Sequence, residues 1–130
     1  MADKLHTAEL TASFLKRLES IETFLMEADA ASTYANLLIE LRSEVIPNLR
    51  RFPLIGRRYL DHPPQSAEAL AQLAALPSGE ASKLREYLSG DYLILYTVAE
   101  PETVVTVTLL SIRRHRQISF DFAKLWSGNV

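Results

Sequence analysis

The spacing of apolar residues changes between the first and the last third of the chain, and this change limits the folds that it can adopt. Near the start, apolar residues recur at steps of three and four positions: Phe14, Leu18, Ile21 and Leu25. That spacing puts them on one side of a helix, for which Thr11 or Ser13 could supply the N-cap. The last third instead holds β-branched and aromatic runs, which favour strands.

A second helical stripe follows the segment MEADAAS, in which Ser32 could cap another helix. Its members are Tyr34, Leu37, Leu38, Leu41, Val45 and Leu49. Pro47 falls inside this pattern and should kink the last turn or end the helix early. Two amphipathic helices with a short joint predict a helical hairpin, and each helix needs an apolar surface to cover. Leu41 lies in the middle of its stripe and should pack on that surface.

The strand-like residues lie after position 84. The run LREYLSGDYLILYTV predicts one strand, or two pieces separated at Ser89 and Gly90. The turn AEPET follows, and VVTVTLLSI predicts a second long strand that pairs with the first as an antiparallel hairpin. The opening KLHTAEL alternates weakly and could form one more strand. Because the helices and strands are segregated, the sequence predicts an α+β fold with helices on one face of an antiparallel sheet.

The middle of the chain is less regular. RRFPLIGRRYLDHPPQ contains four proline and glycine positions and predicts a loop or an extended crossing. SAEALAQLAAL is rich in alanine and predicts a short helix capped by Ser66, which PSGE ends. The length of 130 residues suits a single domain spanning 1–130.

Composition excludes several classes of protein. The net charge of −2 does not suit a chain that coats nucleic acid along its whole surface, so any polyanion binding must be local. The absence of cysteine excludes disulfides and thiolate metal sites. His6, His62 and His115 have no ligand spacing, so no zinc site and no cofactor are expected. The start has no apolar signal core and no run approaches the roughly 20 residues of a membrane span, so a soluble, cytoplasmic protein is expected.

Basic residues gather in two places. SIRRHRQISFDF places Arg113, Arg114, His115 and Arg116 directly after the most strand-like run. Arg50, Arg51, Arg57 and Arg58 flank FPLIG, and no acidic residue lies between positions 45 and 60. The first cluster could be a solvated strand end that protects the sheet from edge aggregation, or a patch for an acidic partner. His115 could act as a general base, and Trp126 could anchor a contact.

The ordered set of helical hairpin, FPLIGR, SGDYLILYTV and a valine-rich strand ending in IRRHRQISFDF resembles the RelE/ParE superfamily. Members are toxins of type II toxin–antitoxin modules, often described as plasmid stabilisation proteins. The resemblance covers roughly residues 5–122. Relative to compact members of the family, Leu60–Ala81 would be a helical insertion. It implies a small sheet of about four strands with the hairpin on one face. It also implies two activities: RelE-like members cut messenger RNA at the ribosome, and ParE-like members poison DNA gyrase without cutting anything themselves.

The residues matched to a RelE-like nuclease site depart from its pattern. Leu93 stands where the central strand of such enzymes carries an arginine, and Phe120 replaces a tyrosine. The stretch LREYLS, matched to a place where lysines are found, holds Arg85 but also Glu86. Metal-independent RNA cleavage needs basic and phenolic groups at these places. Arg114 is the one match, with His115 beside it as a second candidate if the chain is a nuclease.

The sequence therefore favours a growth-inhibiting toxin that acts by binding, not as an enzyme, and that a cognate antitoxin neutralises. Its target would be a large assembly such as DNA gyrase, or the ribosome if the chain is an endoribonuclease. A third interpretation is a fold that has lost toxicity and only binds a partner. The residues expected to contact partners are Arg57, Arg58, Arg85, Arg113, Arg114, Arg116 and Trp126.

Overall fold

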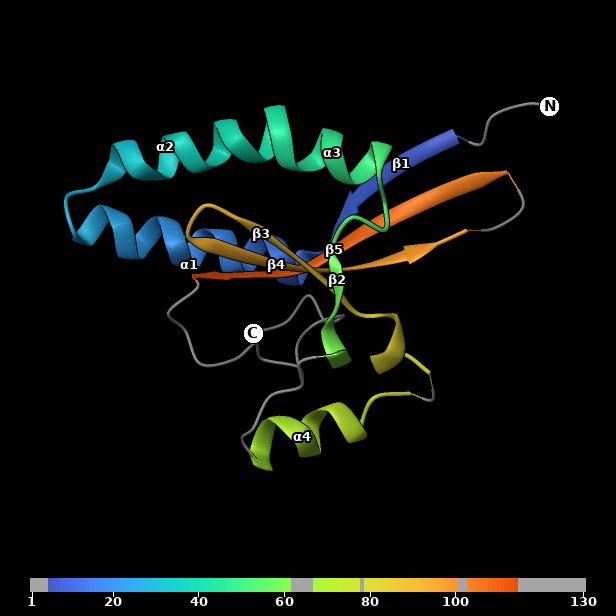
Figure 1. The fold of residues 1–130 in the computed structure, drawn as a ribbon. Helices are drawn as coiled ribbons and strands as arrows, with labels where there is room; N and C mark the ends of the chain where they lie inside the picture. Colours follow the sequence, from blue (N-terminus) through green and yellow to red (C-terminus); the bar gives the residue numbers. More distant parts are fainter. Residues whose placement is uncertain (1–4, 62–66, 78, 101–102, 115–130) are drawn as a thin grey trace.

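The computed structural model describes residues 5–61, 67–77, 79–100 and 103–114. Helices α1 (Ala12–Glu27), α2 (Ala31–Glu40) and α3 (Ile46–Arg51) cover one face of a sheet. Helix α4 (Ala67–Ala74) lies on the opposite side (Figure 1). This arrangement confirms the α+β class and the helical hairpin packed on one face.

The sheet has five strands: β1 (Leu5–Leu10), β2 (Arg57–Arg58), β3 (Arg85–Ser89), β4 (Tyr92–Ala99) and β5 (Val104–Arg114). Their spatial order is β1-β5-β4-β3-β2. Strands β2 to β5 pair antiparallel with their neighbours, whereas β1 pairs parallel with β5. The run LREYLSGDYLILYTV forms two strands, β3 and β4, which separate at Ser89 and Gly90. This is one of the two predicted arrangements. Gly90 has a positive φ of 56°, which suits a tight turn.

Helix α1 is capped by Thr11, one of the two expected residues, whose Oγ1 accepts a hydrogen bond from the Phe14 amide at 3.0 Å. The expected cap at Ser32 is wrong, because α2 begins at Ala31 and its N-cap Ala30 makes no side-chain capping bond. Asp29, with φ of 56°, turns the chain between the two helices before Ser32 is reached.

Pro47 does not end the second helix early. A π-helical turn, η1 (Leu41–Val45), joins α2 to α3, and the Ile46 amide donates to the carbonyl of Leu41, five residues back. The helix then continues to Arg51. The wider turn accommodates the proline ring, which would otherwise clash with a carbonyl of the preceding turn.

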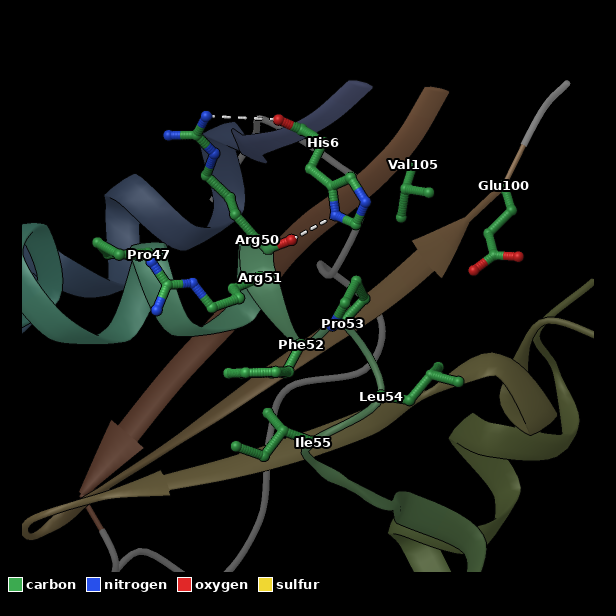
Figure 2. Close-up of a pocket in the computed structure, with 10 residues that line it drawn as sticks. All are labelled: His6, Pro47, Arg50, Arg51, Phe52, Pro53, Leu54, Ile55, Glu100 and Val105. Carbon is green, nitrogen blue, oxygen red and sulfur yellow. Dashed lines mark hydrogen bonds between the residues drawn. The ribbon is translucent and has the colours of Figure 1, made fainter. Parts of the chain in front are cut away.

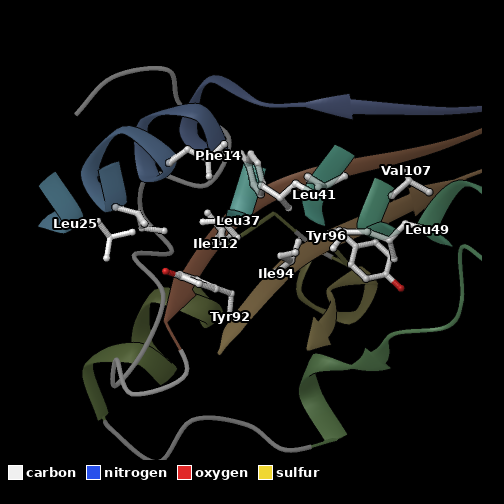
Figure 3. Packing of buried hydrophobic residues seen from close by; sticks show 14 residues of the cluster. Phe14, Leu25, Leu37, Leu41, Leu49, Tyr92, Ile94, Tyr96, Val107 and Ile112 are labelled. Atoms are coloured by element: carbon white, nitrogen blue, oxygen red, sulfur yellow. The ribbon is translucent and has the colours of Figure 1, made fainter. Parts of the chain in front are cut away.

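The main core lies between the helices and the sheet (Figure 3). Both predicted stripes contribute to it, including Leu41, and the strands supply Tyr92, Ile94, Tyr96 and Val107. A second, smaller cluster lies on the opposite face of the sheet, where the segment with α4 packs. It consists of Tyr59, Leu73, Leu84, Leu93, Leu95 and Leu110.

A β-bulge in β5 places two neighbouring residues in different clusters. Leu95 is paired with Ser111 and Tyr96 with Leu109, so Leu110 is the extra residue on β5. Leu109 packs in the main core and Leu110 in the second cluster, and both are fully buried. Two short 3₁₀ helices, η2 (Tyr59–Asp61) and η3 (Ala81–Lys83), lie between β2 and β3. The predicted cap Ser66 lies outside the described residues.

Candidate partner-binding surfaces

The arginines at the end of β5 lie on two different faces of the sheet. Arg113 is paired with Leu93 and Arg114 with Tyr92, and successive residues of a strand point to opposite faces. Leu93 belongs to the second cluster, whereas Tyr92 belongs to the main core. Arg113 therefore faces the side of α4, and Arg114 faces the side of the helical hairpin. The other predicted residues of this segment, His115, Arg116, Phe120 and Trp126, lie outside the described part of the chain.

Arg114 contacts the helical hairpin. Its guanidinium carbon lies 5.1 Å from the centre of the Phe24 ring in α1, within the range of a cation–π contact. Burial raises the pKa of Tyr92, while the positive charge of Arg114 acts in the opposite direction. This guanidinium therefore packs over one end of the main core.

Arg113 belongs to a partly buried charged group on the other face. Arg57 donates from Nε to Glu86 Oε1 at 2.6 Å, and the Glu86 side chain is only 4% exposed. Burial lowers the pKa of the Arg113 guanidinium, whereas the charges of Glu86 and Tyr59 act to raise it. The same face holds Leu93, 5% exposed and packed among apolar side chains. The resemblance matched Arg114 to a nuclease residue, but Arg113 is the arginine that shares a face with Leu93.

The predicted contact residues Arg58 and Arg85 lie at the edge formed by β2 and β3. They are direct cross-strand partners. Arg58 is exposed, whereas Arg85 donates from Nη1 to the carbonyls of Gly56 at 2.6 Å and Leu54 at 3.3 Å. Arg85 therefore has a structural role, because it holds the segment that precedes β2.

That segment, residues 52–56, is fixed from a second side by Tyr96. The buried phenol donates to the carbonyl of Pro53 at 2.8 Å and accepts from the Gly56 amide at 2.9 Å. A Cβ at position 56 would lie 2.5 Å from the Tyr96 hydroxyl, so only glycine fits here. Burial raises the pKa of Tyr96, while the hydrogen bond from Gly56 lowers it.

The segment forms one wall of an open hollow of about 1330 Å³ (Figure 2). Its lining residues are His6, Pro47, Arg50, Arg51, Phe52, Pro53, Leu54, Ile55, Glu100 and Val105. Sequence reasoning noted the arginines around FPLIG but did not single out its apolar side chains or His6 as surface features. The signal that could have found them is a set of large apolar residues between turn-forming positions, beside a basic pair.

His6 joins β1 to α3 at the rim of this hollow. Its Nδ1 donates to the carbonyl of Arg50 at 2.5 Å, and Arg50 Nη2 donates to the carbonyl of His6 at 3.4 Å. These two bonds fix the end of α3 against the first strand. His6 is thus a structural contact in this arrangement.

The described residues hold no group of three or more histidine, aspartate or glutamate side chains that could bind a metal ion. Within the same ranges, every helix is too short or too polar to cross a membrane.

The chain matches a protein-family model and several solved structures. The family model described as "ParE toxin of type II toxin-antitoxin system, parDE" matches residues 8–118. Among solved structures, the chain is similar to one in the crystal structure of the toxin–antitoxin complex RelBE2 from Mycobacterium tuberculosis. That match has 17% identity and a TM-score of 0.48, and covers 90% of this chain and 98% of the other. No curated protein sequence matches significantly. Because the family model spans most of its length, the chain belongs to the ParE toxin family of type II toxin–antitoxin systems.

Proposed function

We propose that this toxin inhibits growth by binding a large cellular target such as DNA gyrase, and that a cognate antitoxin neutralises it. Family membership supports the toxin role. The observation that carries the binding mechanism is Leu93, which is buried in an apolar cluster at the position matched to a catalytic arginine. Leucine neither donates hydrogen bonds nor carries charge, so it cannot stabilise a phosphate in a transition state.

The neighbours of Leu93 support the same conclusion. Glu86 places a carboxylate on this face, and that carboxylate is paired with Arg57. A buried carboxylate neutralises part of the positive charge that RNA cleavage without a metal requires. Arg57 and Arg113 are therefore better suited to contact an acidic protein surface than to transfer protons.

The proposed contact surface with the target is the edge of β2 and the adjoining face of the sheet. Arg57 is 55% exposed and Arg58 is also exposed, while Arg113 is half-buried. Positive side chains of this kind speed the encounter with an acidic surface and set its orientation. Arg116 and Trp126 remain part of the proposal although they lie outside the described residues. Arg85 and Arg114, which make contacts within the chain, would act indirectly by keeping this region in place. The action would take place in the cytoplasm, where gyrase and ribosomes are found.

One observation favours the second candidate, a ribosome-dependent endoribonuclease. Arg57, Arg113 and the phenol of Tyr59 all lie on the side of the sheet that carries Leu93. Such a set could bind a phosphate and position a phenol near it. A third candidate, a partner-binding fold without toxicity, is kept as an outcome of the test.

The test has two arms. Purified toxin is added to gyrase with supercoiled DNA, and trapped, cleaved DNA is measured. Toxin is also added to translating ribosomes, and cleavage positions in the message are mapped. We expect gyrase trapping that weakens about fivefold with Arg113→Ala and further with Arg57→Ala in addition, because each cation that contacts the target contributes on the order of 1 kcal/mol.

The matched control is Arg42→Ala, which removes an exposed arginine from the helical side of the molecule. Codon-positioned message cleavage that Arg113→Ala alone abolishes would overturn the binding mechanism and establish the nuclease. Silence in both arms, together with normal binding of the antitoxin, would favour the third candidate.

A further inference from the structure

The hollow beside α3 exposes apolar side chains that a protein in water would normally cover. Phe52 is 54% exposed, Leu54 59% and Ile55 52%. All three belong to the segment that ends at Gly56, and the aliphatic side chain of Val105 lies across the hollow (Figure 2). A contiguous apolar patch with a polar rim is typical of a binding surface.

The wall of this hollow is already in place before any partner arrives. Tyr96 holds Pro53 and Gly56, and Arg85 holds Leu54 and Gly56, through four hydrogen bonds from side chains of the sheet. A segment fixed in this way loses little conformational freedom on binding, and that favours affinity.

The volume of the hollow indicates the size of the occupant. It measures about 1330 Å³, which is more than the roughly 300–1,000 Å³ of pockets for small molecules. A stretch of polypeptide with two or three apolar side chains fits an open hollow of this size.

The charges around the hollow indicate the chemistry of that stretch. Arg50 and Arg51 end α3 at one side, and Glu100 lies at the far side, across the apolar residues (Figure 2). Arg50 is held by the carbonyl of His6, whereas Arg51 forms no ion pair with any described residue. An acidic residue that follows or precedes the apolar ones would pair with Arg51.

From these observations we infer that the hollow is the docking site for an acidic and apolar segment of the cognate antitoxin. The inference rests on the proposed function, because it assumes that an antitoxin exists. The bound segment would place apolar side chains against Phe52, Leu54 and Ile55, and a carboxylate against Arg51. A second copy of this chain fits less well, because a twofold contact centred here would bring both pairs of arginines into one interface.

The first experiment locates the antitoxin by photo-crosslinking. The probe is the purified protein product of the reading frame adjacent to the toxin gene. A photoreactive phenylalanine analogue replaces Phe52 in one variant and Phe24 in the other. The two positions are matched, since Phe24 is 52% exposed and lies on α1, away from the hollow lining. We expect a crosslink from position 52 at least tenfold stronger than from position 24. A crosslink from position 24 only would overturn the inference.

The second experiment measures affinity with paired variants. Ile55→Asp and Arg51→Glu change the hollow, and Ile39→Asp and Arg42→Glu make the same changes at exposed positions outside it. We expect Ile55→Asp to weaken antitoxin binding about thirtyfold and Arg51→Glu about tenfold, with less than threefold change in either control. The effect of Arg51→Glu should shrink at high salt, whereas that of Ile55→Asp should not. Circular dichroism would verify that all four variants are folded.

The outcomes separate this inference from the function on which it rests. If the wild-type chain does not bind the neighbouring protein, the proposed antitoxin fails and the docking site fails with it. If the wild type binds and the hollow variants bind equally well, only the docking site is wrong. It is also wrong if the hollow variants weaken gyrase trapping tenfold but leave antitoxin binding unchanged. A dimer of the isolated chain that Ile55→Asp dissociates would assign the hollow to a second copy instead.

Discussion

The hydroxyl of Tyr96 is the contact on which the hollow wall depends most. Replacing Tyr96 with phenylalanine removes an acceptor from the Gly56 amide and a donor to the Pro53 carbonyl. The amide lies in a buried hydrogen bond, so losing its acceptor costs about 1–3 kcal/mol, and the bond to Pro53 contributes about 1 kcal/mol more. We therefore expect Tyr96→Phe to lower the free energy of unfolding by about 2–4 kcal/mol.

Urea denaturation followed by circular dichroism measures this change. The matched control is Tyr87→Phe, because among the described residues the Tyr87 hydroxyl makes only an exposed hydrogen bond, accepted from Asn48 at 3.5 Å. That control should change stability by less than about 0.5 kcal/mol. A loss below about 0.5 kcal/mol for Tyr96→Phe as well would refute the reasoning, since the segment would then be held by other contacts. At 2 kcal/mol or more, the variant should also bind the antitoxin more weakly, because the wall of the hollow would no longer be fixed.

Three further predictions address the core and the same contact. Gly56→Ala should destabilise the protein by about 1–3 kcal/mol in urea denaturation, because the new Cβ would meet the Tyr96 hydroxyl at 2.5 Å; unchanged stability would show that the segment moves freely. Leu41→Ala, at a site 5% exposed in the middle of the helical stripe, should cost about 2–5 kcal/mol, and less than about 1 kcal/mol would contradict its packing. Burial raises the pKa of Tyr96 and Tyr59 above 10.0, so the folded state favours the neutral phenols. The stability that this provides should be present below pH 10 and be lost as the pH rises through the raised values, and a flat profile of melting temperature from pH 9 to pH 11 would count against it.

The periodic parts of the fold could be predicted from the sequence because their spacing directly reports which face is buried. Both helical stripes, the hairpin of β4 and β5, and the break at Gly90 follow from local patterns. The true start of α2 could not be predicted. Asp29 has a left-handed backbone conformation, and the helix begins at Ala31, before the expected cap Ser32. The sequence allowed the helix to continue past Pro47, but the π-helical turn that precedes this proline leaves no simple mark in the sequence.

The candidate site was harder to predict because it depends on register. Sequence reasoning grouped Arg113 and Arg114 as one contact surface, but adjacent strand residues face opposite sides. Which of them shares a face with Leu93 depends on the bulge at Leu110, and a shift by one residue would exchange their places. The ion pair between buried Glu86 and exposed Arg57 likewise arises from cross-strand pairing between segments that are far apart in the chain.

The β2 edge directly follows the hollow segment, but the far end of the proposed target surface, at Arg113, lies well away from the hollow, and this leads to a last prediction. Val105, at the hollow, and Arg113, at the proposed target surface, are separated by eight residues of β5, or about 26 Å at 3.3 Å per residue. The hollow and Arg113 also lie on different sides of the sheet. Arg113 lies on the side of the second cluster, whereas α3, which lines the hollow, packs on the other side. A short antitoxin fragment that fills only the hollow should therefore bind the toxin without restoring gyrase activity.

Neutralisation would then require the rest of the antitoxin to reach Arg113, on the other face of the sheet. Truncated antitoxins of increasing length, each measured for affinity and for relief of gyrase trapping, should separate the two effects. Affinity should rise first, as the hollow is filled, and protection should appear only with fragments whose effect depends on Arg113. If the shortest fragment that binds also protects gyrase fully, the target contacts the hollow itself, and the assignment of the two surfaces is wrong.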